Sequence, residues 1–356
     1  MTERDLSAIG AAKLEGLRLA DGWVVSKALP KKSSSGGTFS FFYEARNGDR
    51  VGFLKAIDFT EAFEPGTDTV SALKHLTAAF ELERDIVVLC AERRMSKVAK
   101  AIAHGEVQVP NMSAMEGRVF YLIFEKADGD VRAQSDITNR LDTLWSLRAI
   151  RDVCLGLEQV HRLQVAHQDT KPSNVLHYPD RSFRITDFGR SSKKDRQVYH
   201  DDFEIAGDRT YAPPELLYGY THNEFNVRRF GTDLYMLGNL VAFMFSGINV
   251  SADMFSRIDD DFHFAKWDGT YAEVLPYIQR AFSDTVTAIE LAIDADIREH
   301  IVPLIRDLCN PDLTFRGHPR GVGTANQYSL MRYTSQLTNL TQKYEIQQRI
   351  KNKKTG

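Results

Sequence analysis

Apolar and polar residues alternate in short stretches over the first third of the chain, and this pattern is typical of half-buried strands. The predicted strands cover residues 23–25, 38–45, 51–57, 107–109 and 119–125. The turn sequence Asn47-Gly48-Asp49 predicts a hairpin between the second and third of them. Between the third and fourth, residues 69–95 carry apolar side chains at helical spacing. This part therefore predicts a small, mostly antiparallel sheet with one main helix.

From about residue 137 the spacing of apolar residues becomes mainly helical. Residues 141–163 predict a long amphipathic helix, and residues 231–246 predict a helix so apolar that it is expected at the centre of a core. Helical patterns continue over residues 271–309, and residues 327–349 predict a polar helix. The polar stretch Lys126-Ala127-Asp128-Gly129-Asp130 marks the boundary between the two parts.

These patterns predict an α+β protein with a small β part and a larger, mainly helical part. The small β lobe is expected at about residues 23–128 and the larger, mainly helical lobe at about residues 129–320. Residues 1–22 are expected to form a lead-in with a short helix before residue 20. Residues 321–356 are expected to form a polar helical tail, which packs on the large lobe or recruits a partner.

Composition and charge narrow the class of protein without indicating a reaction. The chain has 356 residues, of which 43% are hydrophobic, so it can bury one large core or two lobes. Its net charge of −3 gives no reason to expect nucleic-acid binding. The three cysteines lack metal-type spacing, which favours buried thiols in a reducing compartment. No apolar run approaches the roughly 20 residues of a spanning helix. We therefore expect a soluble, cytoplasmic protein without a membrane or nucleic-acid partner.

Two short motifs carry the clearest chemical signal. The first is His167-Gln168-Asp169-Thr170-Lys171-Pro172-Ser173-Asn174, and the second is Asp187-Phe188-Gly189. Asp169 and Asn174 lie five positions apart, and Asp169 and Asp187 lie eighteen apart. This spacing suits a loop with a base and one metal ligand, then a short hairpin, then a second metal ligand. Phosphoryl transfer needs such groups close together, because an acid must orient the hydroxyl and oxygen ligands must hold Mg²⁺.

The two motifs resemble the catalytic loop and metal-binding turn of eukaryotic-type protein kinases. The resemblance covers about residues 23–316 and includes Ala212-Pro213-Pro214-Glu215, which is similar to the end of the family's activation segment. It implies a two-lobed protein kinase domain over residues 23–320. Such a domain uses ATP and Mg²⁺, with Mn²⁺ as an alternative, and transfers the γ-phosphoryl group to protein substrates. Lys171, in the pattern Asp-x-Lys-Pro-x-Asn, is similar to the serine/threonine type. The resemblance sets no oligomeric state.

The family pattern also implies roles for individual residues. Asp169 would act as catalytic base or orient the hydroxyl, while Lys171 and Lys55 would contact phosphate groups. Glu83 is the preferred ion-pair partner of Lys55, with Glu81 as the alternative, because the two acids point in different directions on a helix. The implied metal ligands are Asn174 and Asp187. The further ATP-binding residues are Gly36, Gly37, Glu125, Asp130 and Leu176. The implied structural residues are His167, Asp233, Glu215 and Arg316.

Four departures from the family pattern carry information. Gln168 replaces the arginine that grips a phosphorylated activation loop, so activity is not expected to depend on that phosphorylation. Possible acceptors in that segment are Ser191, Ser192, Tyr199 and Thr210. Phe53 stands where the family has a small alanine above the adenine, and Asp208 replaces a threonine that contacts the catalytic residues. The glycine-rich loop keeps only Gly37 of its three usual glycines.

Two other functions compete with an active kinase. A pseudokinase scaffold, which binds nucleotide or a partner protein without catalysis, is suggested by the altered glycine loop, Gln168 and Phe53. A small-molecule phosphotransferase on a related core is disfavoured by Glu215 and Arg316, which such enzymes generally lack. The retention of Lys55, Asp169, Asn174 and Asp187 favours the active serine/threonine kinase.

Overall fold

The structure is a computed structural model that describes residues 9–30, 40–63, 66–138, 141–203 and 205–355. It divides into two units, Met1–Asp128 and Gly129–Gly356, and each is described by itself. The division falls within the polar stretch that the sequence marks as a boundary. The predicted limits of the domain and of its lobes stay a prediction.

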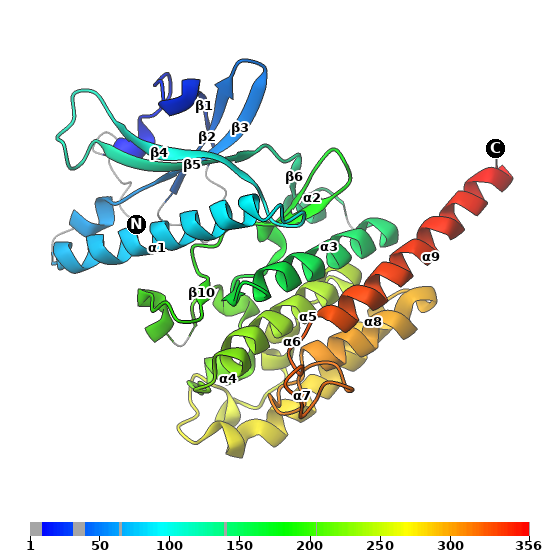
Figure 1. Cartoon of the computed structure of the whole chain (residues 1–356). Helices are drawn as coiled ribbons and strands as arrows, with labels where there is room; N and C mark the ends of the chain where they lie inside the picture. The colour runs from blue at the N-terminus through cyan, green and yellow to red at the C-terminus, as the bar shows by residue number, and fades with distance from the viewer. Residues whose placement is uncertain (1–8, 31–39, 64–65, 139–140, 204, 356) are drawn as a thin grey trace. The chain divides into compact units, whose positions relative to one another are not determined.

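The alternating segments of the first unit form a five-stranded antiparallel sheet (Figure 1). In order across the sheet, its strands are β1 (Val24–Leu29), β2 (Ser40–Asn47), β3 (Arg50–Ile57), β5 (Arg118–Glu125) and β4 (Ala101–Gln108). The hairpin between β2 and β3 turns at Gly48, whose φ of 56° suits glycine. The prediction of a small antiparallel sheet is therefore confirmed. β4 begins earlier than predicted, because polar residues such as His104 and Glu106 obscure its pattern.

The two faces of this sheet are covered by different segments. On one face, β2, β3 and β5 contribute Tyr43, Leu54 and Ile123 to a buried core with the segment before β1. On the other face lies α1 (Thr69–Glu92), which begins after Asp68, whose carboxylate accepts from the Ser71 N–H (3.3 Å). The prediction of one main helix here is confirmed, although the helix ends slightly before residue 95.

The predicted helix within residues 1–20 is wrong for the part that the structure describes. Residues 9–22 contain two short 3₁₀ turns, Gly10–Ala12 and Ala20–Gly22, and no α-helix. Gly16 and Gly22 have φ angles of 84° and 80°, and such left-handed positions interrupt a helix. Four buried apolar side chains of this segment join the core of the sheet instead: Ile9, Ala11, Leu14 and Leu19.

The second unit is mainly helical, as predicted. Its α-helices are α2 (Val131–Ile137), α3 (Thr143–His161), α4 (Pro214–Leu217), α5 (Gly231–Ser246), α6 (Val250–Ser256), α7 (Tyr271–Ala292), α8 (Ala295–Leu308) and α9 (Met331–Thr355). Its short strands are β6 (Gly129–Asp130), β7 (Val165–Ala166), β8 (Val175–His177), β9 (Phe183–Ile185) and β10 (Ser192–Lys193). They pair as a three-stranded sheet, β6-β8-β9, and as the ribbon β10-β7.

The apolar helix α5 occupies the core of this unit and matches the predicted residues. It contacts α3, α6, α7 and α8, and it ends at Gly247, whose φ of 74° forms a left-handed C-cap. The helical patterns predicted over residues 271–309 belong to α7 and α8, which are separated by extended chain at Ile293 and Asp294. No single helix of the described residues is long and apolar enough to cross a membrane. One bent pair, residues 226–246 with α6, passes only when its parts are taken together.

The C-terminal helix α9 packs on α3, and Figure 1 shows the two side by side. Thr334 of α9 donates to Glu158 of α3 (2.7 Å), and Arg148 of α3 pairs with Glu345 of α9 (2.8 Å). The tail helix starts a few residues later than predicted, at Met331. Of the two roles expected for the tail, these contacts favour packing on the large helical unit.

Candidate active site

The loop between β7 and β8 is fixed to the core by one buried carboxylate. Asp233, near the start of α5, accepts hydrogen bonds from the backbone N–H groups of His167 (2.8 Å) and Gln168 (2.6 Å). The ring of His161 contacts the same carboxylate at 2.7 Å. Asp233 is fully buried, and such a group needs fixed donors to offset its lost hydration. The contacts predicted for Asp233 are therefore present.

Both ring nitrogens of His167 are used by the backbone. Nε2 lies 3.0 Å from the carbonyl oxygen of Thr186, and Nδ1 accepts from the N–H of Asp169 (3.2 Å). The ring is fully buried and meets Phe188 edge-on, with centroids 4.9 Å apart. His167 thus joins the loop to the segment that carries Asp187, which agrees with a structural rather than an acid–base role.

Two side chains and one backbone N–H contact the carboxylate of Asp169. Lys171 Nζ lies 3.1 Å from Asp169 Oδ2 and 3.4 Å from Asp208 Oδ2. The amide nitrogen of Asn174 donates to Asp169 Oδ2 and to the Asp169 carbonyl, each at 2.8 Å. The backbone N–H of Asp208 donates to Asp169 Oδ1 (2.9 Å). The orientation of Asp169 is therefore set by hydrogen bonds on both of its oxygens.

Burial and neighbouring charges shift the pKa values of this cluster. Burial raises the pKa of the Asp169 carboxyl, Asp187 raises it further, and Lys171 opposes the shift. Burial alone would lower the pKa of Lys171, but Asp169, Asp208 and Asp187 outweigh it, so that pKa is raised. Burial would raise the pKa of Asp208, yet the Thr210 N–H and Lys171 bring it below its usual value. Lys171 is therefore cationic at neutral pH and is shared between carboxylates.

Asn174 and Asp187 offer oxygen atoms suited to a divalent cation. The hydrogen bonds of Asn174 to Asp169 use its amide nitrogen, which leaves the amide oxygen as the group that could bind a cation. Asp187 is half-buried at a φ of 67°, and its charge acts on Asp169. No cluster of three His, Cys, Asp or Glu ligands occurs in the described part of the chain. Such a sparse set fits Mg²⁺, which usually keeps waters and phosphate oxygens among its ligands.

In the first unit, Lys55 of β3 and Glu83 of α1 form a close ion pair. Lys55 Nζ lies 2.8 Å and 2.9 Å from the two Glu83 oxygens, and Glu83 is 3% exposed. Glu81, the alternative partner, is exposed. Phe53 lies on the same face of β3 as Lys55, and its ring stacks on that of Phe42 with centroids 5.3 Å apart. Gly36 and Gly37 lie outside the described residues.

The remaining predicted ATP-binding residues, Asp130, Leu176 and Glu125, each have contacts within the protein. The carboxylate of Asp130 accepts from the Ala133 N–H (2.7 Å) and caps α2, so its observed contact is structural. Leu176 of β8 is half-buried and pairs with Asp130 of β6. Glu125 ends β5, and Lys100 Nζ lies 3.5 Å from its carboxylate. The nucleotide contacts expected of these three residues stay predictions.

Glu215 and Arg316 form the buried ion pair that the family pattern implies. Arg316 Nη1 and Nη2 donate to the two Glu215 oxygens at 2.6 Å and 2.8 Å. Arg316 is 0% exposed and also donates to the Asn310 carbonyl (2.9 Å). The pair joins α4 to the segment after α8, far from Asp169 in sequence.

Sequence reasoning missed the side chains that surround Gln168. Its amide nitrogen donates to Ser192 Oγ (2.7 Å) and to the Arg190 carbonyl (3.1 Å). Its amide oxygen accepts from Arg229 Nη1 (2.6 Å), and Arg229 pairs in turn with Asp201. None of these partners belongs to a motif, so no pattern in the sequence could have indicated them.

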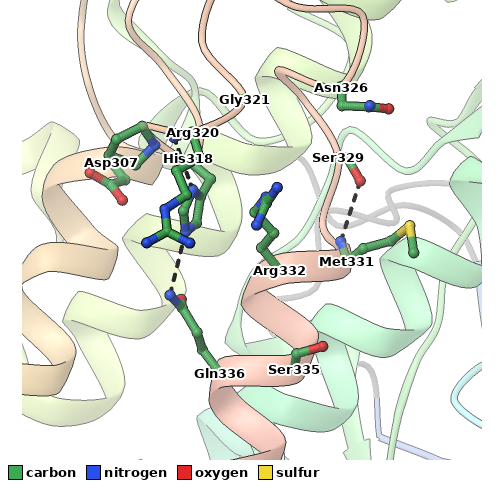
Figure 2. A pocket seen from close by; sticks show the side chains of 11 residues that line it. Asp307, His318, Arg320, Gly321, Asn326, Ser329, Met331, Arg332, Ser335 and Gln336 are labelled. Atoms are coloured by element: carbon green, nitrogen blue, oxygen red, sulfur yellow. Dashed lines mark hydrogen bonds between the residues drawn. The ribbon is translucent and has the colours of Figure 1, made fainter.

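A cavity of about 890 Å³ lies outside these motifs in the second unit. Figure 2 shows that its lining includes Asp307, His318, Arg320, Arg332 and Gln336, which come from α8, the segment after Arg316 and the start of α9. Burial, together with Arg332 and Arg320, lowers the pKa of His318. The cavity contains none of the predicted site residues, so it is not a candidate for the phosphoryl-transfer site.

Comparison with known proteins places these motifs in a family. Residues 59–318, more than half of the chain, match the family described as "Protein kinase domain". Over 186 residues, which is 48% of this chain and 42% of the relative, the chain is 26% identical to an Aurora kinase of Debaryomyces hansenii. It is 28% identical to the serine/threonine-protein kinase PknA of Mycobacterium tuberculosis over 142 residues, 40% of this chain and 31% of the relative.

A third relative is the CTD kinase subunit alpha of Saccharomyces cerevisiae, which is 26% identical over 206 residues. That match covers 57% of this chain and 33% of the relative. The chain thus spans less than half the length of each of these three relatives. The matched residues include Asp169, Asp187 and Glu215, and the chain belongs to the protein kinase domain family.

Proposed function

We propose that the protein is a serine/threonine kinase that transfers the γ-phosphoryl group of MgATP to hydroxyl groups of protein substrates. The observation that carries the proposal is the set of contacts around Asp169, whose carboxylate meets Lys171 at 3.1 Å and Asn174 at 2.8 Å. Protein kinase domains use ATP and a divalent metal in general. The choice of Mg²⁺, the serine/threonine specificity and a cytoplasmic location are the finer parts of the proposal.

The geometry supports a separate role for each residue of the proposed site. Asp169 would accept a hydrogen bond from the substrate hydroxyl and hold it for in-line attack. Lys171, kept cationic by the carboxylates around it, would offset the charge that develops on the transferred group. Asn174 and Asp187 would hold the metal, which neutralises phosphate oxygens when bound. Lys55, oriented by Glu83, would contact the phosphates of the nucleotide.

We also propose that activity does not depend on phosphorylation of the activation segment. Gln168 is neutral, and both ends of its side chain already have protein partners. Ser191 and Ser192 are buried, with 0% and 1% of their surface exposed, and Thr210 is exposed. Protein treated with phosphatase, and shown by mass spectrometry to carry no phosphate, should keep the activity of untreated protein. Loss of activity on dephosphorylation would contradict this part of the proposal.

The central experiment measures transfer of radiolabelled phosphate from ATP to a panel of protein substrates, with Mg²⁺ and with Mn²⁺. Wild type should label serine and threonine, and D169A and D187A should lose nearly all transfer. D260N serves as a folded control, because Asp260 forms an exposed ion pair with Lys266 (2.7 Å) away from the motifs. Labelling of tyrosine alone would reject the specificity, and equal labelling by wild type and D187A would reject the reaction.

The second candidate is a pseudokinase that binds nucleotide without catalysis. The stacked pair Phe42 and Phe53 favours it, because two rings occupy the face of the sheet where Lys55 lies. A ligand raises the melting temperature of the state that it binds. A shift with MgATP but no labelling of any substrate would favour this candidate, whereas labelling that D187A abolishes would exclude it.

A further inference from the structure

We propose that Asp201 is a built-in anion that holds the segment after Asp187 in position, where a phosphate would otherwise be needed. In this proposal, Asp201 orients Arg229, and Arg229 orients Gln168, the residue before Asp169. The three are therefore positioning residues. The inference rests on the proposed kinase activity and deepens it, because it names the groups that replace regulation by phosphorylation.

Asp201 meets the guanidinium of Arg229 in a nearly buried ion pair. Arg229 Nη2 donates to Asp201 Oδ1 (2.9 Å) and to the Asp201 carbonyl (3.0 Å). Their side chains are 19% and 6% exposed. The carboxylate also accepts from the Val198 N–H (2.9 Å) and from Ser192 Oγ. One acidic side chain therefore fixes two places in its own segment and anchors both to the helical core through Arg229.

Gln168 connects this ion pair to the catalytic loop. Arg229 Nη1 donates to the Gln168 amide oxygen (2.6 Å), and the Gln168 amide nitrogen donates to Ser192 Oγ (2.7 Å). Gln168 is 2% exposed and has a φ of 61°, a conformation that non-glycine residues keep only when their surroundings fix it. The next residue is Asp169. A shift of the segment would therefore pass through Gln168 to the carboxylate that orients the hydroxyl.

Asp201, Arg229 and Gln168 form a network, and its charges explain why a neutral residue suits position 168. Asp201 and Arg229 carry one charge each and offset one another, and Gln168 adds none. The nearby Arg228 uses Nη2 to donate to two backbone carbonyls, those of Asp201 (3.1 Å) and Phe203 (3.0 Å). A second cation at position 168 would require a second anion, which is the situation that phosphorylation resolves. The anion that Arg229 meets in the structure is an encoded residue, Asp201.

Two substitutions of unchanged shape test the charge logic. D201N removes the anion, and Q168E places a carboxylate where the Gln168 amide oxygen already accepts from Arg229. We expect D201N alone to lower kcat at least about tenfold, with little change in KM for ATP. Q168E alone should lower kcat as well, because it sets two carboxylates against one guanidinium and removes the amide that donates to the Arg190 carbonyl and Ser192 Oγ. In the double variant Q168E/D201N, the charge balance returns and kcat should exceed that of either single variant.

Three measurements keep the proposal separate from a general loss of stability and from the kinase function itself. D260N is the matched control for Asp→Asn at an exposed ion pair, and its kcat should equal that of wild type. Thermal unfolding should follow the same pattern as kcat: Q168E should lower the melting temperature of wild type but raise that of D201N. This measurement tests the network even if wild type transfers no phosphate. Limited proteolysis should cut residues 190–203 faster in D201N than in wild type or in Q168E/D201N.

Two results would overturn the inference. D201N with kcat within about twofold of wild type would show that the segment needs no anion. Independent effects would show that the two residues do not share a network. In that case Q168E would lower kcat by the same factor, and the melting temperature by the same number of degrees, with and without D201N. If wild type is inactive but Q168E lowers the melting temperature of wild type and raises that of D201N, the kinase function is rejected and the network of Asp201, Arg229 and Gln168 is retained.

Discussion

Replacement of Glu215 by glutamine tests how much a buried ion pair stabilises the second unit. Wild-type Glu215 receives both Nη atoms of Arg316, at 2.6 Å and 2.8 Å, and the two side chains are 3% and 0% exposed. Burial acts to lower the pKa of Arg316, but Glu215 outweighs it and the pKa is raised. Arginine cannot release its proton in practice, so E215Q leaves an uncompensated buried charge.

The size of the effect follows from what Arg316 retains. Breaking a buried pair by removing one partner costs about 3–5 kcal/mol. Arg316 keeps its hydrogen bonds to the carbonyls of Asn310 (2.9 Å) and Gly231 (3.3 Å), and its guanidinium lies 5.1 Å from the ring of Tyr235. These contacts favour the lower end, about 3 kcal/mol. For a unit of this size, that corresponds to a fall of roughly 6–12 °C in melting temperature.

Calorimetry of the 356-residue chain measures this fall against a matched control. Glu290 pairs with Arg306 at 3.1 Å, but the side chains are 41% and 57% exposed, so E290Q should cost less than about 1 kcal/mol. The double variant E215Q/R316M no longer carries the uncompensated guanidinium of Arg316. It should therefore regain at least about half of the stability that E215Q loses. Equal destabilisation by E215Q and E290Q would refute the reasoning, because burial would then not decide the value of the pair.

Three further predictions follow from local geometry. E83Q should lower kcat at least about tenfold while the fold is kept, because Lys55 loses the charged partner that orients it; steady-state kinetics and circular dichroism check this. G207A should impair transfer more than stability, since a Cβ there would lie 2.1 Å from the Gln168 carbonyl and 2.9 Å from Asp169 Oδ1. Kinetics and thermal unfolding check this: kcat should fall strongly, while the melting temperature changes little. Burial raises the pKa of Asp307 from 3.8 to about 6, so its ionisation destabilises the fold as pH rises through that range. D307N should therefore match wild type in stability near pH 4 and exceed it by up to about 2 kcal/mol at pH 8, measured by urea unfolding at both pH values.

The sequence by itself determined most of the main elements and the residues of local motifs. Most residues of the α5 helix are apolar, so its place in a core followed from composition alone. Asp169, Lys171 and Asn174 lie within a few positions of one another, and a loop of that length keeps them together. For the same reason, the hairpin at Gly48 and the start of α1 could be predicted from a few adjacent residues.

Only the tertiary structure decided the partners that are distant in sequence and belong to no motif. Gln168 could be recognised as a departure from the family, but its contact with Arg229, 61 positions away, depends on how α5 and the preceding turn pack. The segment before β1 was expected to be helical, and its apolar side chains instead cover a sheet that forms later in the chain. Periodicity records which side of an element is buried, whereas only packing specifies what that side meets.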